Sequence, residues 1–75
     1  MNDKRRAKAN EAEKLLESAL SLIEYLVDEE ETALEGIPEN MCQRVEQCEE
    51  TLSHLRDAQS SVEEAIEKLE SAVDR

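Results

Sequence analysis

Glutamates three residues apart are the feature of this sequence that comes closest to metal chemistry. Glu46 and Glu49 have this spacing, as do Glu67 and Glu70. In helical bundles such pairs hold two metal ions when their carboxylates face the bundle interior. Each pair here encloses a residue of an apolar seam, so we expect the carboxylates to point along the flanks into water. A metal-dependent hydrolase assembled across a dimer interface is an alternative that this orientation disfavours.

The other potential ligands and nucleophiles match no known site. His54 lies outside the apolar seam and has one carboxylate, Asp57, but no second histidine three residues away. Cys42 and Cys48 are six residues apart, about 9 Å along a helix, and with one histidine they do not complete a four-ligand zinc site. No Ser-His-Asp pattern or glycine-rich phosphate loop is present in the sequence. We therefore expect no enzyme activity, no metal, no cofactor and two free thiols.

Two heptad patterns define the elements that would position these side chains. In each half of the chain, apolar or nearly apolar residues alternate at spacings of four and three, which is typical of a helix packed on another helix. The two sets are Ala9, Ala12, Leu16, Ala19, Ile23, Leu26, Glu30 and Ala33 in the first half, and Met41, Val45, Cys48, Leu52, Leu55, Gln59, Val62, Ile66, Leu69 and Val73 in the second.

The first heptad pattern has start and stop signals at its two ends. Asn2 or Asp3 can cap a first helix that covers about 3–35. Gly36, the only glycine, can end that helix because glycine tolerates the left-handed conformation that follows many helices. We therefore expect one uninterrupted helix before Gly36.

A short turn separates the two patterns. Pro38, the only proline, suits the first turn of a second helix over about 38–74, although a start near Val45 is an alternative. A connection as short as 36–38 makes the two helices antiparallel neighbours. The sequence therefore predicts an all-α fold, an antiparallel, coiled-coil-like two-helix hairpin that forms a single domain over 1–75.

The apolar surface of both expected helices is wider than one neighbouring helix can cover. The economical solution is a homodimer in which two hairpins form a four-helix bundle, because a two-fold interface needs only one self-complementary surface. Docking on a different protein would use the same face. The residues expected on this oligomer or partner face are Leu15 and Leu22 on one flank of the first helix, Leu20, Val27 and Leu34 on its other flank, and Ala58, Ala65 and Ala72 on the second helix.

The charge balance excludes several classes of partner. The chain has 20 acidic and 9 basic residues, a formal net charge of −11, which repels phosphate backbones and anionic membrane surfaces. No stretch approaches the roughly 20 apolar residues that span a bilayer, and a charged helix rather than an apolar signal core follows the basic start. We expect no nucleic-acid partner, no membrane partner and a cytoplasmic location.

The basic residues concentrate at the start of the chain, at Lys4, Arg5, Arg6 and Lys8. In an antiparallel hairpin this segment lies beside the acidic end of the second helix, so we expect mutual neutralisation. A nucleic-acid arm is the alternative, but no aromatic residue is interleaved with these cations.

An acidic cluster occurs where the first helix ends. Negative charge is unfavourable there, because the helix dipole presents its negative end. Either the cluster meets a basic partner surface or it only keeps the hairpin in solution. This acidic tip consists of Asp28, Glu29, Glu31, Glu35 and Glu39.

The run Asp28-Glu29-Glu30-Glu31, followed by the turn Pro38-Glu39-Asn40, resembles a motif of small acidic helical-hairpin proteins of bacteria and their phages. That family has no known function to transfer. The resemblance implies a two-helix layout, a bacterial or phage origin and a structural or docking role for the turn. The chain departs from the family where Cys42-Gln43-Arg44-Val45 follows the turn.

These features together predict a non-catalytic interaction or structural module. It would self-associate through its wide apolar face and present the acidic tip to a partner. The alternative is an acidic regulator that imitates a nucleic acid and binds a basic protein.

Overall fold

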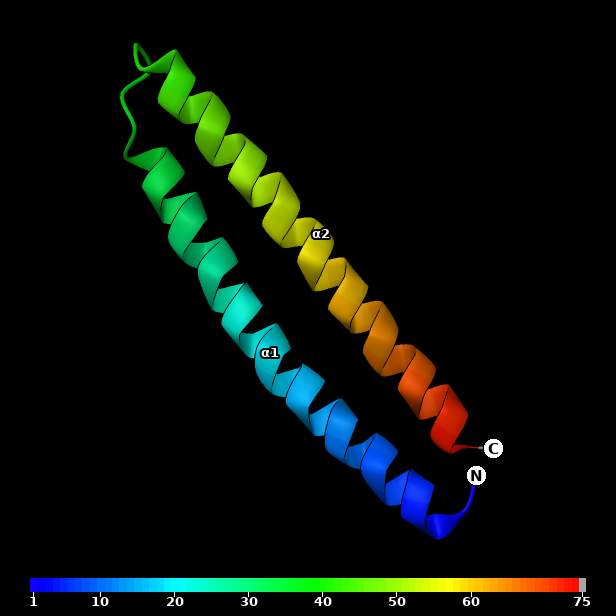
Figure 1. Ribbon diagram of the computed structural model, residues 1–75. Coiled ribbons are helices and arrows are strands. Elements are labelled where there is room, and N and C mark those ends of the chain that lie inside the picture. The colour runs from blue at the N-terminus through cyan, green and yellow to red at the C-terminus, as the bar shows by residue number, and fades with distance from the viewer. Residues whose placement is uncertain (75) are drawn as a thin grey trace.

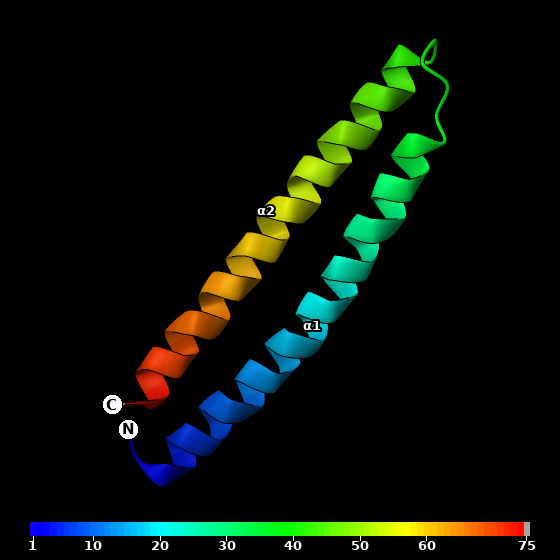
Figure 2. The same ribbon diagram turned by 180° about the vertical axis from the view of Figure 1, so that it is seen from behind.

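The computed structural model describes residues 1–74, which form two helices joined by a loop (Figure 1). α1 spans Asp3–Glu35 and α2 spans Cys42–Val73. The helices lie side by side and antiparallel, and the two ends of the chain lie at the same end of the hairpin, as Figure 2 shows from behind. The hairpin measures 58 × 14 × 11 Å. The expected all-α hairpin is confirmed.

α1 begins at its expected residue because Asn2 caps it. The Asn2 side-chain oxygen Oδ1 accepts a hydrogen bond from the main-chain N–H of Arg5 at 2.9 Å. Its carbonyl accepts from the N–H of Arg6, also at 2.9 Å, which closes the first turn. Asp3 is the first helical residue, where a carboxylate interacts favourably with the helix dipole. Of the two expected caps, Asn2 is therefore the one used.

The end of α1 differs from the expected left-handed glycine cap. Gly36 has φ −85° and ψ −5°, which is right-handed helical backbone. Its N–H donates to the carbonyl of Ala33 and the N–H of Ile37 donates to that of Leu34, both at 3.2 Å. Each of these bonds joins residues three apart and tightens the last turn. They give hydrogen-bond donors to carbonyls at the end of the helix, as a left-handed cap would have done.

α2 begins four residues later than the expected start at Pro38. The Pro38 carbonyl accepts the N–H of Met41 at 3.0 Å and closes a turn through Glu39 and Asn40. Asparagine favours turns because its side chain competes for nearby backbone groups. Met41, with φ −99° and ψ 58°, precedes the first helical residue, Cys42. The loop therefore covers 36–41 rather than 36–38.

The seam expected on α2 is confirmed beyond its first member. Cys48 and Leu52 are buried, with 8% and 3% of their surface exposed, whereas Met41 is 41% exposed. Together with Val27 of α1, at 8%, they are the buried apolar side chains of residues 1–74. The half-buried members of the seam are Val45, Leu55, Gln59, Val62, Ile66, Leu69 and Val73.

The contact line on α1 departs from the expected seam in the second half of the helix. Val27 is buried and Leu34 is half-buried, whereas Leu26 is 48% exposed and Ala33 is exposed. Leu20 is half-buried as well. The prediction that Val27 lies on a free flank is therefore wrong, and Leu20 and Leu34 of the same expected flank are covered in part.

Helical geometry explains this shift. An α-helix has 3.6 residues per turn, so a stripe of residues seven apart rotates by about 20° per heptad relative to a straight contact line. The stripe of Ala12, Ala19 and Leu26 rotates out of the contact along α1, and the stripe of Leu20 and Val27 rotates into it. Both helices are amphipathic, and within residues 1–74 neither is long and apolar enough to cross a membrane.

Candidate functional site

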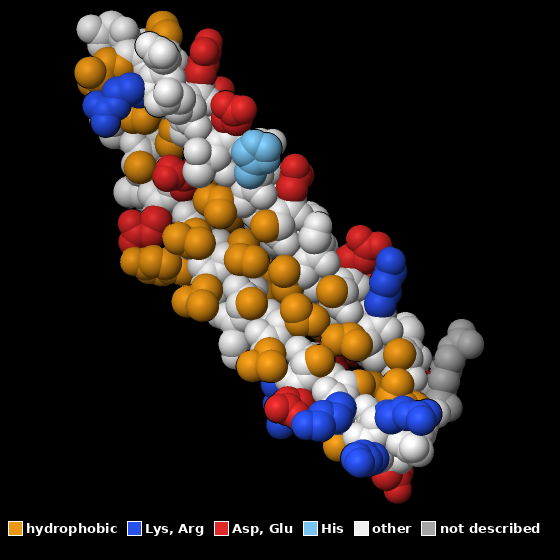
Figure 3. Space-filling model, in the orientation of Figure 1, with side chains coloured by type: hydrophobic (Ala, Val, Ile, Leu, Met, Phe, Trp, Pro, Cys, Tyr) orange, Lys and Arg blue, Asp and Glu red, His pale blue; other side chains and the backbone are white. Residues whose placement is uncertain are grey.

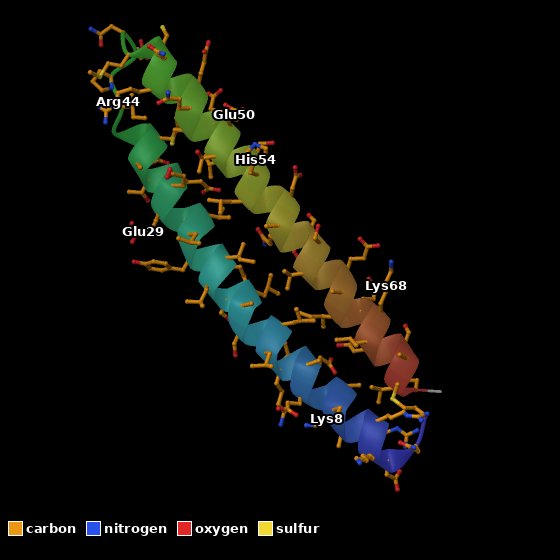
Figure 4. The ribbon with its side chains drawn as sticks, in the orientation of Figure 1. Lys8, Glu29, Arg44, Glu50, His54 and Lys68 are labelled. Carbon is orange, nitrogen blue, oxygen red and sulfur yellow. The ribbon has the colours of Figure 1, made fainter. Side chains whose placement is uncertain are left out.

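The glutamate pairs considered as metal ligands lie on the outside of α2. Glu46, Glu49, Glu67 and Glu70 are all exposed. His54 is exposed too, and Figure 4 shows it on the outer side of α2. Among residues 1–74, no three His, Cys, Asp or Glu side chains converge in a way that could hold a metal ion.

The half-buried Glu30 is paired with a core thiol. The Sγ atom of Cys48 donates to the main-chain carbonyl of Glu30 at 3.5 Å and lies 3.6 Å from its carboxylate oxygen Oε2. Burial, followed by the charge of Glu30 and its hydrogen bond, raises the pKa of the Cys48 thiol above its ordinary value of 9.0. The thiol therefore stays protonated and acts as a hydrogen-bond donor within the core.

The second thiol has a different setting. Cys42 is exposed, and its Sγ donates a weak hydrogen bond to the carbonyl of Glu39 at 3.7 Å. Both cysteines are free, as expected.

The most exposed leucines lie on one side of the hairpin. Leu15 and Leu22 are each 67% exposed, and Leu26 is 48% exposed. These three leucines are spaced seven and then four residues apart along α1, so they lie on one stripe of that helix. Figure 3 shows hydrophobic side chains gathered over both helices on the face in view.

The alanine stripe of α2 borders the same face. Ala33, seven residues after Leu26, and Thr51, seven residues before Ala58, line one shallow hollow between the helices. Residues seven apart lie on nearly the same side of a helix, so the leucine stripe and the alanine stripe flank one surface. We define the leucine-alanine face by Leu15, Leu22, Leu26, Ala58, Ala65 and Ala72.

The opposite side of the hairpin is acidic. Glu31 and Glu35 of α1 and Glu49 of α2 line a groove there, together with Arg56, whose Nη2 contacts Glu31 Oε1 at 2.8 Å. The same stripes continue at seven-residue spacing through other glutamates. We define the acidic face by Glu17, Glu24, Glu31, Glu49, Glu63 and Glu70.

Two carboxylates of this side meet across the helices. A hydrogen bond with the carboxyl of Glu70 raises the pKa of the half-buried Glu13 above its ordinary value of 4.5, and partial burial and the charges of Glu70 and Glu17 add to the shift. If the carboxyls of Glu13 and Glu70 were both ionised, two negative charges would lie next to each other across the helices. The raised pKa of Glu13 therefore favours its protonated form beside the Glu70 carboxyl.

The five carboxylates of the acidic tip do not form one surface. Glu31 and Glu35 line the groove on the acidic face, whereas Asp28 and Glu29 line a hollow with Tyr25. Glu39 lies in the loop, beside a third hollow. Glu29 is hydrogen-bonded to Tyr25, and this contact, with the charge of the carboxylate, raises the pKa of the tyrosine above 10.0.

The basic start of the chain is neutralised differently from expectation. Arg6 pairs with Asp3 at 3.5 Å and Lys8 with Glu11 at 3.4 Å, so both ion pairs lie within α1. The link from this segment to α2 is a hydrogen bond from Nε of Arg6 to the main-chain carbonyl of Val73 at 3.2 Å. The Lys8 ammonium is largely exposed, with 77% of its side chain accessible.

Sequence reasoning found part of the apolar face and missed part of it. Leu15, Leu22 and Ala58 are exposed as expected, and Ala65 and Ala72 are half-buried beside them. Leu26, a member of the expected seam, is instead 48% exposed on this face. The drift of a seven-residue stripe on a 3.6-residue helix is the signal that identifies Leu26.

Comparisons of the chain with protein-family models, curated proteins and solved structures found no match.

Proposed function

We propose that this chain is a non-catalytic interaction module that associates with itself through the leucine-alanine face. Two hairpins would then form a four-helix bundle, with the acidic face of each copy turned to water. The observation that supports this proposal is the exposure of Leu15, Leu22 and Leu26 on a single stripe beside small alanine side chains. Small residues allow the backbone of a second helix to approach closely, and leucines fill the space above them.

The small core of the hairpin also supports association. Val27, Cys48 and Leu52 are the buried apolar side chains of residues 1–74, and a chain of this size leaves much of its surface in water. Full burial of a leucine contributes roughly 1.5–3 kcal/mol, and a two-fold dimer would cover three exposed leucines from each copy. Association itself costs roughly 4–15 kcal/mol. The two quantities are comparable, so we expect a dimer of modest affinity whose population rises with protein concentration.

The dimensions of the hairpin fit an interface of ordinary size. With the helices side by side, the broad face measures 58 × 14 Å. Its projected area is therefore about 800 Å², large enough to hold an interface of standard size.

Light scattering over a concentration series, under reducing conditions that exclude disulfides through Cys42, tests the proposal. We expect the molar mass to rise from that of the 8.5 kDa chain toward about twice this value. A folded species that stays at 8.5 kDa up to millimolar concentration would contradict self-association.

A matched pair of variants locates the interface. Leu22→Glu places a charge in the centre of the leucine-alanine face, and Ser53→Glu adds the same charge at an exposed position away from it. A buried unpaired carboxylate is strongly unfavourable, so Leu22→Glu should keep the protein monomeric while Ser53→Glu should not. If both variants dimerise like the parent chain, the leucine-alanine face is not the interface.

A further inference from the structure

We propose that the second copy docks antiparallel to the first, across a two-fold axis perpendicular to the helices. In this arrangement α1 packs on α1 of the second copy, α2 packs on α2, and the two loops lie at opposite ends of the bundle. Lys8 of each copy then pairs with Glu29 of the other. This inference rests on the proposed function and deepens it by specifying the orientation of the partner and an intermolecular ion pair.

The spacing of the exposed leucines supports this axis. The midpoint between Leu15 and Leu22 falls between Ser18 and Ala19. A two-fold axis through that point places Leu15 of one copy opposite Leu22 of the other, and the reverse contact follows by symmetry. The two most exposed leucines of α1 are thereby complementary to each other across the axis.

The alanine stripe has the same symmetry. Ala58 and Ala65 lie at equal distances from the point between Ser61 and Val62. An axis through that point places Ala58 of one copy opposite Ala65 of the other. Facing alanines permit close contact of the two α2 helices, which a leucine at either position would prevent.

The two midpoints lie at nearly the same level of the hairpin. At one end Nε of Arg6 contacts the carbonyl of Val73 at 3.2 Å, and toward the loop the thiol of Cys48 contacts the carbonyl of Glu30 at 3.5 Å. Counting inward from these contacts, the midpoints on α1 and α2 differ by about two residues, or about 3 Å of helical rise. Side-chain lengths absorb a difference of this size, so one axis serves both helices.

The charges at the two ends of α1 select this orientation over the alternative. Lys8 and Glu29 are symmetric about the same midpoint as Leu15 and Leu22, and Figure 4 shows Lys8 toward the chain ends and Glu29 toward the loop. An antiparallel partner brings the acidic end of one α1 to the basic start of the other. An axis along the hairpin would instead place the acidic ends of both copies together, where they repel.

A charge-reversal cycle tests the pairing. Lys8 and Glu29 are 21 residues apart on one helix, about 32 Å, so they cannot pair within a chain. Lys8→Glu and Glu29→Lys should each weaken dimerisation by about fivefold, and the double variant should return to within about twofold of the parent chain. Lys68→Glu, which reverses an exposed charge paired with Glu64, should not rescue Glu29→Lys.

Cysteine cross-linking provides an independent readout. In a Cys42→Ser background, Ala19→Cys places a thiol beside the axis, so oxidation should yield a covalent dimer. The background chain without Ala19→Cys should not cross-link, because Cys48 is buried.

The outcomes separate the two proposals. Dimers that show neither cross-linking nor rescue would overturn the antiparallel orientation and leave self-association intact. A chain that remains monomeric at all concentrations would overturn both.

Discussion

At the scale of single residues, burial decides which apolar side chains stabilise the hairpin. Leu52 is 3% exposed and lies between the helices, whereas Met41 is 41% exposed at the start of α2. Cys48 was expected to fill the core and does so, with Glu30 as its hydrogen-bond acceptor. Glu30 accepts from the thiol through its main-chain carbonyl, and its carboxylate lies close by. A sequence pattern does not predict this arrangement.

Leu52→Ala should lower the free energy of unfolding by roughly 2–5 kcal/mol, because it removes a fully buried side chain. Met41→Ala, the control, removes an apolar side chain that is largely in water and should change stability by less than about 1 kcal/mol. Chemical denaturation followed by circular dichroism measures both. Equal effects of the two changes would show that Leu52 is not in the core.

The carboxyl pair of Glu13 and Glu70 predicts a dependence of stability on pH. Because the pKa of Glu13 is raised in the folded hairpin, the native state holds more protons than the unfolded chain between the two pKa values. Stability from this pair is therefore complete below the unfolded pKa and is lost as the pH rises through the folded one.

Glu13→Gln should accordingly raise the thermal midpoint near pH 7 and have no such effect below about pH 4, where Glu13 is also uncharged. Glu24→Gln removes an exposed carboxylate from the same side of α1 and serves as the control. A stabilisation by Glu13→Gln that is equally large in acid would exclude repulsion from Glu70 as its cause.

At the scale of elements, the loop between the helices is where sequence expectation and structure differ most. The turn that begins at Pro38 and contains Asn40 leaves Met41 in a non-helical conformation. α2 therefore starts at Cys42. Gly36 occupies right-handed helical backbone, which any residue can adopt. The glycine is therefore not required by its backbone angles.

Gly36→Ala should be tolerated and should stabilise the hairpin by about 0.4–1 kcal/mol, because alanine restricts the unfolded chain. An added Cβ would lie 3.6 Å from the carbonyl oxygen of Ala33 and 3.9 Å from that of Thr32, both ordinary contacts. Urea denaturation at fixed protein concentration measures the change. A loss of about 1 kcal/mol would indicate the left-handed conformation in solution.

At the scale of the whole molecule, the hairpin has two unlike sides. One carries exposed leucines and alanines, and the other carries carboxylates with Arg56 among them. A four-helix bundle built on the apolar side would leave the negative charge of each copy facing outward, which favours a closed dimer over larger assemblies.

Self-association predicts that thermal stability depends on protein concentration. A hundredfold excess over the dissociation constant adds up to about 2.7 kcal/mol, which corresponds to a rise of up to roughly 10–20 °C in the midpoint for a chain of this length. Circular dichroism melts over such a range should show this rise for the parent chain. Leu22→Glu should melt at a lower and constant temperature, and a constant midpoint for the parent chain as well would contradict the proposed dimer.

The two helices and their antiparallel order followed from the sequence alone, because heptad spacing, a lone glycine and a lone proline act locally, and the first cap was narrowed to Asn2 or Asp3. The sequence also determined the seam of α2 around Leu52. The side of α1 that meets α2, in contrast, became clear from the packing of the two helices. Over three heptads a helix of 3.6 residues per turn rotates by about 60° relative to its seven-residue stripes. This rotation buries Val27 and exposes Leu26, and it thereby creates the face on which the proposed function depends.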